Sequence, residues 1–521
     1  MVHNALGKRP PIWVFLLALV LVAIAYLTER EGVISTADGI VYTAVASNVA
    51  DGRGLTVPFS GYTDQYAPAE AAAYGDAVPL RHWPPLYPSL LAAFDRLGFT
   101  PAAAASVLNP ALFGLNGLLL AQYTRRLSSD AWAWAFLLVL ALALLRDPEI
   151  ATSSLVVLHA STLAEPLFLT SILVGLILLS RFGETGEGRD FWFASTVATL
   201  STATKFNGLA FVLLVSVIGA LCGTRRERLV RGLGSLSMGV LPSVFWMAAA
   251  RREGPQPIPN GVAAALDSLV DGVSSMVAPA SWPRVAAIVY ASWLAWILTI
   301  ALIRIIRARC DQRSLRQTAI PAALGALMVL QLVITRAFVD QNVRVAGRQM
   351  AVVHVLLLLA AVGVAGIAIR CWPRVVRGIL ALCLLVALIG GAHPLVRLIA
   401  DPIQPPDNRE VAGAIATIPE GHTIFTNIPD VVYQATGRTA HLVPCQTDYF
   451  TGLVRARYRE EVEELRALIR SEAASVVLVS GLMGRPAECG STLPFEGESG
   501  IVARRNSSNI FIASPVSKGL R

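Results

Sequence analysis

The chain has 521 residues, of which 55% are hydrophobic and only 15% are charged, and its mean hydropathy is +0.59. Soluble globular proteins usually have about a quarter of their residues charged, so this composition excludes an ordinary soluble protein and indicates an integral membrane protein. The net charge of +8 does not indicate nucleic-acid binding, because the Arg and Lys residues fall in short breaks between apolar runs. Alternate breaks are rich in Arg, which is the positive-inside pattern of a multi-pass membrane protein.

Apolar runs near the ~20 residues needed to cross a bilayer recur almost to residue 398. The run from 191 to 222 is either one long helix or two spans, and a break at Lys205 keeps every Arg-rich break on one side of the membrane. The first run resembles a secretory signal, but the many later spans favour a retained anchor. We predict about eleven spans, near 11–28, 102–124, 131–146, 158–180, 191–204, 206–222, 229–250, 286–306, 318–336, 349–369 and 377–397.

The charge pattern predicts a cytoplasmic amino terminus, and it therefore places the loop 29–101 and the tail outside the cytoplasm. We predict a transmembrane domain over 1–398 and a small, soluble, extracytoplasmic α/β domain over 399–521. Within this tail, the sequence predicts buried strands at 422–427 and 475–480, an amphipathic helix at 455–473 and a hairpin at 502–514. Cys445 and Cys489 lie in the tail, where they form either a disulfide or two free thiols.

The first external loop begins with residues at helical spacing. Asp38, Tyr42 and Ala46 predict a helix along the membrane surface, ended by the glycines at 52 and 54. Asp38 at its start is either a residue favoured by the helix dipole or a carboxylate with a chemical role. Later in the loop, RHWPPLYPSLLAAF (81–94) places two prolines at the start of a further helix.

Four polar or charged residues lie in or beside apolar runs, where an apolar residue would cost less free energy. Glu165 lies several residues into the predicted span 158–180, where it is either functional or caps the turn at Pro166. His159 precedes Glu165 by six residues. It is either a hydrogen-bonded structural histidine or part of the same surface as Glu165. Lys205 and Arg348 lie on the predicted external side, against the charge rule. They either snorkel to the interface or hold an anion, for which a phosphate is well suited.

Arg81 and His82 extend this basic character in the first external loop. Together with Lys205 and Arg348, they predict an external basic pocket that faces the two carboxylates, Asp38 and Glu165.

The order of these motifs resembles the bacterial GT-C glycosyltransferases, and more closely the branch of the protein O-mannosyltransferases and the lipid A aminoarabinose transferases. The resemblance covers the whole membrane domain. Its motifs are the Asp38 helix with its two glycines, WPPLYP (83–88), AEPLF (164–168), TKFNG (204–208) and the basic residue before a late span.

The resemblance implies transfer of one hexosyl or pentosyl unit from a polyprenyl-phosphate donor, usually with inversion. The acceptor would be a hydroxyl of an envelope glycan, lipid or protein outside the bacterial plasma membrane. Asp38 matches the catalytic base or acceptor-orienting acid, and Glu165 a second acidic position. Arg81, His82, Lys205 and Arg348 match donor-phosphate positions. The remaining candidates to line the substrate are Tyr42, Trp83, Tyr87 and His159.

Two departures from the family pattern stand out. Gly39 follows Asp38 where many relatives have a second acid, so a divalent metal is left open as a cofactor. Trp83 stands where relatives often have Lys or His before the prolines, and it could instead stack on the sugar or the prenyl chain. The alternative functions are a transporter or flippase of lipid-linked sugars, whose buried charges would line a path, and a ligase that transfers a preassembled glycan.

Overall fold

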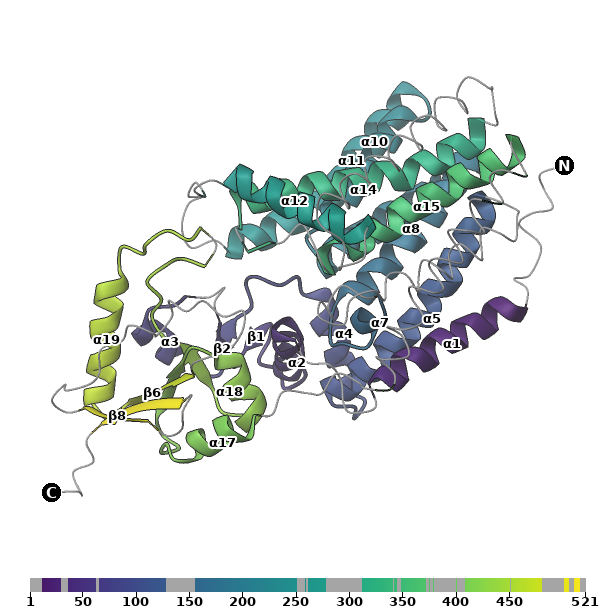
Figure 1. The fold of residues 1–521 in the computed structure, drawn as a ribbon. Coiled ribbons are helices and arrows are strands. Elements are labelled where there is room, and N and C mark those ends of the chain that lie inside the picture. Colours follow the sequence, from purple (N-terminus) through teal and green to yellow (C-terminus); the bar gives the residue numbers. More distant parts are fainter. Residues whose placement is uncertain are drawn as a thin grey trace.

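In a computed structural model of the protein, long helices pack into a bundle, and an α/β unit lies beside one end of it (Figure 1). The structure describes residues 12–29, 36–61, 65–127, 155–250, 258, 261–277, 312–340, 342–343, 348–371, 374, 378, 400, 408–449, 451–479, 501–505 and 510–515. The predicted spans near 131–146 and 286–306, and all but one residue of that near 377–397, lie outside these residues.

The bundle contains helices with a shared apolar core. Its elements are α1 (Ile12–Thr28), α5 (Pro101–Leu127), α7 (Leu155–His159), α8 (Glu165–Thr185), α9 (Gly188–Thr204), α10 (Gly208–Leu221), α11 (Arg225–Ala250), α12 (Gly261–Val277), α14 (Gln312–Phe338) and α15 (Arg348–Cys371). Among the described residues, four helical segments are long and apolar enough to cross a membrane: α5, α8, Arg316–Phe338 and Arg348–Ile367. The fold is therefore mostly helical, with membrane-crossing helices, and the full number of spans stays a prediction.

The predicted break at Lys205 is confirmed. Lys205 has an extended backbone, with φ −157° and ψ 136°, between the end of α9 and the start of α10. The two helices then pack side by side. Glycine permits close helix packing elsewhere in the bundle, since a Cβ at Gly175 of α8 would overlap the ring of Phe211 in α10.

The predicted span 158–180 is wrong at its amino-terminal end. Instead of lying inside the span, Glu165 is the first residue of α8, and the short helix α7 ends earlier, at His159. Pro166 explains the shift, because proline fits the first turn of a helix but breaks a helix interior. The carboxylate of Glu165 therefore lies at the mouth of the bundle.

The loop 29–101 contains the predicted helix, and more than half of that helix is buried in the protein, so its place along the membrane surface stays a prediction. The elements of this loop are α2 (Ala37–Ala50), β1 (Thr56–Val57), β2 (Phe59–Ser60), α3 (Pro68–Tyr74), β3 (Val78–Pro79) and α4 (Leu86–Asp95). Thr36 caps α2 by accepting a hydrogen bond from the Gly39 amide at 3.0 Å. After α2 ends, Gly52 and Gly54 adopt positive φ angles of 80° and 77°, which most residues avoid. α4 begins directly after the proline pair.

The tail contains helices α17 (Arg409–Ala416), α18 (Pro429–Thr436) and α19 (Tyr458–Arg470), and strands β4 (Thr423–Thr426), β5 (Ala440–Leu442), β6 (Ala474–Val479), β7 (Ile501–Arg505) and β8 (Ile510–Pro515). The six-stranded sheet has the order β2-β5-β4-β6-β8-β7. Its edge strand β2 comes from the loop 29–101, called the first loop below, and pairs in parallel with β5, with Phe59 opposite Ala440. The strands and helix predicted for the tail are present, and the sheet extends beyond the tail itself.

The first loop and the tail share one hydrophobic core. Phe59 of β2 and Val45 of α2 belong to the same buried cluster as Phe425, Leu442 and Val476 of the tail sheet. Polar bonds add to this contact, since Arg455 Nη2 donates to the Gln65 carbonyl at 3.2 Å. The helix that carries Asp38 is thus packed on the tail.

Cys445 is fully buried beside this core and is disulfide-bonded. Cys489, the other cysteine of the predicted pair, lies outside the described residues.

Because the shared core depends on Phe59, Phe59→Ala should lower the free energy of unfolding by about 3–5 kcal/mol, the usual cost of emptying a buried Phe site. Faster proteolysis of the tail in nanodiscs should accompany this loss. Phe193→Ala is the matched control, because Phe193 is exposed on the bundle surface. Equal protease resistance of wild type and Phe59→Ala would show that the tail does not need this contact.

Candidate functional site

Four charged side chains from separate stretches of the chain meet at one end of the bundle. Arg348 Nη2 lies 2.5 Å from Asp38 Oδ2, and Lys205 Nζ lies 2.5 Å from Glu165 Oε1. Arg348 Nε also lies 4.0 Å from Glu165 Oε1, so the two pairs are joined. We call Asp38, Glu165, Lys205 and Arg348 the four-charge cluster. It is neutral overall, with two carboxylates and two cations.

Each member of the four-charge cluster lies at a helix end. Asp38 and Glu165 lie in the first turns of α2 and α8, where the helix dipole favours a negative charge. Lys205 follows the last turn of α9, where a positive charge is favoured. Arg348 begins α15, which the dipole disfavours, so its ion pairs with both carboxylates offset that cost.

Burial sets the energetic character of the cluster. The side chain of Glu165 is only 5% exposed and that of Lys205 is 18% exposed. A charge so far removed from water is stable only when it is paired. Asp38 and Arg348 retain 24% and 26% exposure, so this half of the cluster remains open to an incoming group.

A polar network inside the bundle holds the chain break before Glu165. Asn109 Nδ2 donates to the carbonyls of Ser161 and Leu163, and to Tyr87 Oη at 3.0 Å. The side chain of Asn109 is fully buried. It thereby ties the break to α5 and to the helix that follows the proline pair.

A second asparagine in α5 supports the start of α8. Asn116 Nδ2 contacts His159 Nε2 at 3.0 Å and donates to the Pro166 carbonyl at 3.1 Å. Thr170 Oγ1 donates to Asn116 Oδ1 at 2.8 Å. His159 is buried, stacks on Phe113 and contacts the Leu155 carbonyl through Nδ1, so it positions the break without contacting the four charges.

Tyr42 and Tyr87 line the cluster from the side of the first loop. Tyr42 lies one turn after Asp38, and its ring meets Tyr87 edge to face at 5.2 Å. Burial, followed by the carboxylates of Asp38 and Glu165, raises the pKa of Tyr42 well above its usual range. Its hydroxyl therefore keeps its proton and remains a hydrogen-bond donor.

The residues before the proline pair have a different environment. Arg81 lies over the Tyr66 ring at 5.6 Å, and no carboxylate of the described residues pairs with it. His82 and Trp83 meet edge to face at 4.8 Å. Burial lowers the pKa of His82 to about 4 against the opposing effect of Asp38, so its imidazole is uncharged at neutral pH.

Within the described part of the chain, no group of three His, Cys, Asp or Glu side chains lies close enough to hold a metal ion. Each carboxylate of the cluster is already bound to a cation.

Comparison with known proteins gives a structural likeness but no match by sequence. No family model and no curated protein matches the sequence. The structure is similar to the crystal structure of ArnT from Cupriavidus metallidurans bound to undecaprenyl phosphate. The likeness has a TM-score of 0.54 at 12% sequence identity and covers 98% of this chain and 99% of that one. The chain has a GT-C fold. At this identity, the GT-C fold is what the likeness establishes.

The four charges are predicted by the sequence pattern, whereas the two asparagines are not. Asn109 and Asn116 are seven residues apart in α5, so they share one helix face inside an apolar span. Two amides at that spacing in an apolar span predict a buried polar contact between helices, because buried amides need partners on neighbouring helices.

Asn116→Ala should lower the free energy of unfolding by about 1–3 kcal/mol, because the Thr170 hydroxyl and the His159 ring each lose a buried partner. Denaturant titration in bicelles measures this. Thr196→Ala is the control, since the exposed Thr196 hydroxyl bonds only to a carbonyl of its own helix. A loss no larger than that of the control would contradict the supporting role of Asn116.

Proposed function

We propose that the protein is a membrane glycosyltransferase that transfers one sugar from a polyprenyl-phosphate donor to an acceptor hydroxyl. The observation that carries this proposal is the four-charge cluster, which combines two cations with two carboxylates at one end of an apolar bundle. The GT-C fold supports it, because the similar ArnT structure contains undecaprenyl phosphate. The sugar is a hexosyl or pentosyl unit, and the acceptor belongs to an envelope glycan, lipid or protein.

The donor phosphate would bind Arg348 and Lys205, because guanidinium and ammonium groups make charge-assisted hydrogen bonds to phosphate oxygens. Both cations are held by carboxylates in the structure. A phosphate that takes over Arg348 therefore releases Asp38. In this way donor binding frees the carboxylate that is needed next.

The released Asp38 then acts as general base. It accepts the proton of the acceptor hydroxyl while the acceptor oxygen forms a bond to the anomeric carbon. The bond from that carbon to the phosphate oxygen breaks, and its electron pair stays on the phosphate. Arg348 and Lys205 stabilise the charge that develops there, which is electrostatic transition-state stabilisation. One such displacement inverts the anomeric centre.

The remaining residues assist binding. Tyr42 lies one turn after Asp38 and would donate its hydroxyl to a sugar, while the fully buried Tyr87 holds the Tyr42 ring edge to face. Arg81 and His82 lie outside the four-charge cluster, so we assign them to the approach of the lipid phosphate, with Trp83 against the sugar or prenyl chain. We place the reaction on the outer face of a bacterial plasma membrane, in line with the charge pattern of the loops.

Asp38→Asn should reduce turnover by about 10²–10⁴-fold, the usual contribution of a general base. It should also bind undecaprenyl phosphate at least as tightly as wild type, since Arg348 loses a competing carboxylate. Single-turnover transfer from polyprenyl-phosphate sugars and lipid binding in nanodiscs measure the two effects. Asp51→Asn, which changes an exposed acid at the end of the same helix, should leave both unchanged. Full turnover by Asp38→Asn would contradict the role of Asp38 as general base.

Lys205→Ala should weaken undecaprenyl phosphate binding by about 10- to 100-fold, the value of a hydrogen bond to a charged group. Acceptor affinity should change little. The double variant Lys205→Ala, Glu165→Gln removes the unpaired carboxylate and separates folding from binding. Donor affinity equal to wild type in the double variant would contradict the phosphate role of Lys205. Arg81→Gln should have a smaller effect, because Arg81 lies outside the cluster.

A further inference from the structure

A second basic site lies at the far end of α9, on the opposite side of the bundle from Lys205. A pocket of about 440 Å³ is lined by Trp192 of α9 and by four residues at the start of α11: Arg226, Glu227, Val230 and Arg231. Most of α9, about 20 Å at 1.5 Å per residue, separates Trp192 from Lys205. The pocket is therefore independent of the four-charge cluster.

The acid in this pocket is already engaged. The Thr224 amide donates to Glu227 Oε2 at 2.8 Å, and the Glu227 amide lies 3.4 Å from Thr224 Oγ1, a reciprocal cap at the start of α11. Arg231 Nη2 lies 3.3 Å from Glu227 Oε1. Glu227 thus serves the helix start and Arg231, and no other carboxylate of the described residues pairs with the cations of this segment.

The arginines at 225–231 differ in how many partners hold their side chains. Arg231 lies over the Phe182 ring at 5.2 Å and donates to the Cys222 carbonyl, so it is held in place. Arg228 Nε donates to the Gly223 carbonyl at 2.8 Å. Arg225 and Arg226 are exposed, and no partner for either exists among the described residues. Of these two, only Arg226 lines the pocket.

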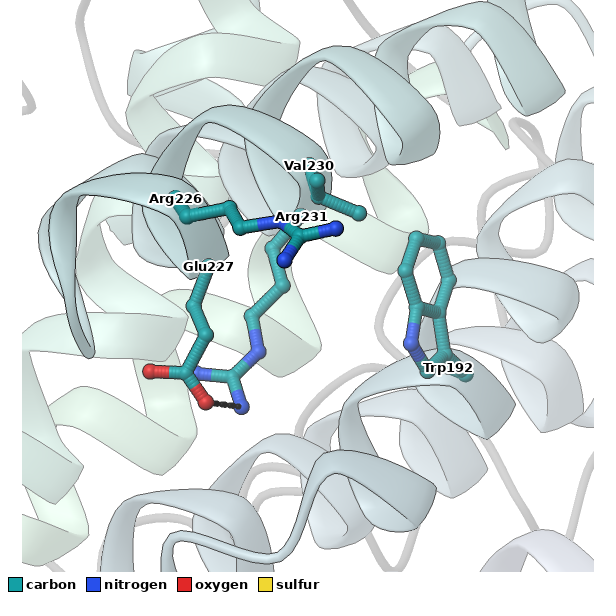
Figure 2. A pocket seen from close by; sticks show the side chains of 5 residues that line it. All are labelled: Trp192, Arg226, Glu227, Val230 and Arg231. Atoms are coloured by element: carbon teal, nitrogen blue, oxygen red, sulfur yellow. Dashed lines mark hydrogen bonds and ion pairs between the residues drawn. The ribbon is translucent and has the colours of Figure 1, made fainter.

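The pocket combines this free cation with apolar and aromatic surfaces. Figure 2 shows the Arg226 side chain extending from α11 towards the indole of Trp192, while Glu227 pairs with Arg231. Next to it on α11, Leu229 and Leu233 are 62% and 57% exposed. A fixed cation, a free cation, a partly buried Trp and exposed leucines fit a lipid whose phosphate headgroup binds the cations and whose acyl chains lie along the helix.

We propose that this pocket binds an acidic phospholipid of the cytoplasmic leaflet. Its phosphate lies between Arg226 and Arg231 beside Trp192, and its acyl chains cover Leu229 and Leu233. The side of the membrane follows from the Arg-rich break at 225–231, which the charge pattern makes cytoplasmic. The lipid holds the starts of α9 and α11 together at the membrane surface.

The test compares two variants that remove the same charge from neighbouring exposed positions. Full-length protein is titrated with phosphatidylglycerol in neutral detergent, and binding is measured by native mass spectrometry. Arg226→Gln should weaken binding by about five- to tenfold, whereas Arg225→Gln should stay within twofold of wild type. Equal losses in both variants would overturn the proposal, since they would mean a diffuse surface charge. No loss in Arg226→Gln would overturn it as well.

Two further measurements identify the ligand. Phosphatidylglycerol should raise the melting temperature of wild type, because a ligand stabilises the folded state it binds. Inorganic phosphate or phosphatidylcholine should not do so, and an equal shift with either would overturn the assignment to an acidic lipid. Phosphatidylglycerol with brominated acyl chains should quench Trp fluorescence in wild type more than in Trp192→Phe. Equal quenching in both would show that the lipid does not lie beside Trp192.

Discussion

The ion pair between Arg348 and Asp38, extended to Glu165 and Lys205, links four parts of the chain that are far apart in sequence. Charges this close to an apolar bundle must be compensated, because leaving a buried charge unpaired is more costly than most packing defects. The helix ends that carry these groups must therefore converge. This constraint explains why the start of α2 meets the starts of α8 and α15.

The rest of the architecture supports that convergence from two sides. Within the bundle, Asn109 and Asn116 hold the chain break before α8 through hydrogen bonds to its carbonyls. Outside the bundle, α2 packs into a core that the first loop shares with the tail. The strand β2 completes the tail sheet at its edge, so the sheet and the helix that carries Asp38 form one continuous unit.

Several elements could be predicted because their signals are local. Gly52 and Gly54 end α2 as expected, since positive φ angles favour glycine. The extended Lys205 breaks α9 from α10 where the charge pattern required a turn. The start of α8 was missed because the apolar run continues upstream through α7 and hydropathy alone does not register the turn before Pro166. The addition of β2 to the tail sheet could not be predicted from the sequence, because a strand of two residues, Phe59 and Ser60, is too short to show an alternating pattern.

The sequence by itself determined the membrane class and the identity of the four charged residues. These properties follow from composition and from the cost of placing single charges in apolar runs, which are local quantities. Only the tertiary structure decided which cation pairs with which carboxylate, and that His159 supports the site from within while Arg81 lies over Tyr66. Those facts depend on how helix ends meet in space, and helix packing depends on contacts between segments that no single stretch of sequence contains.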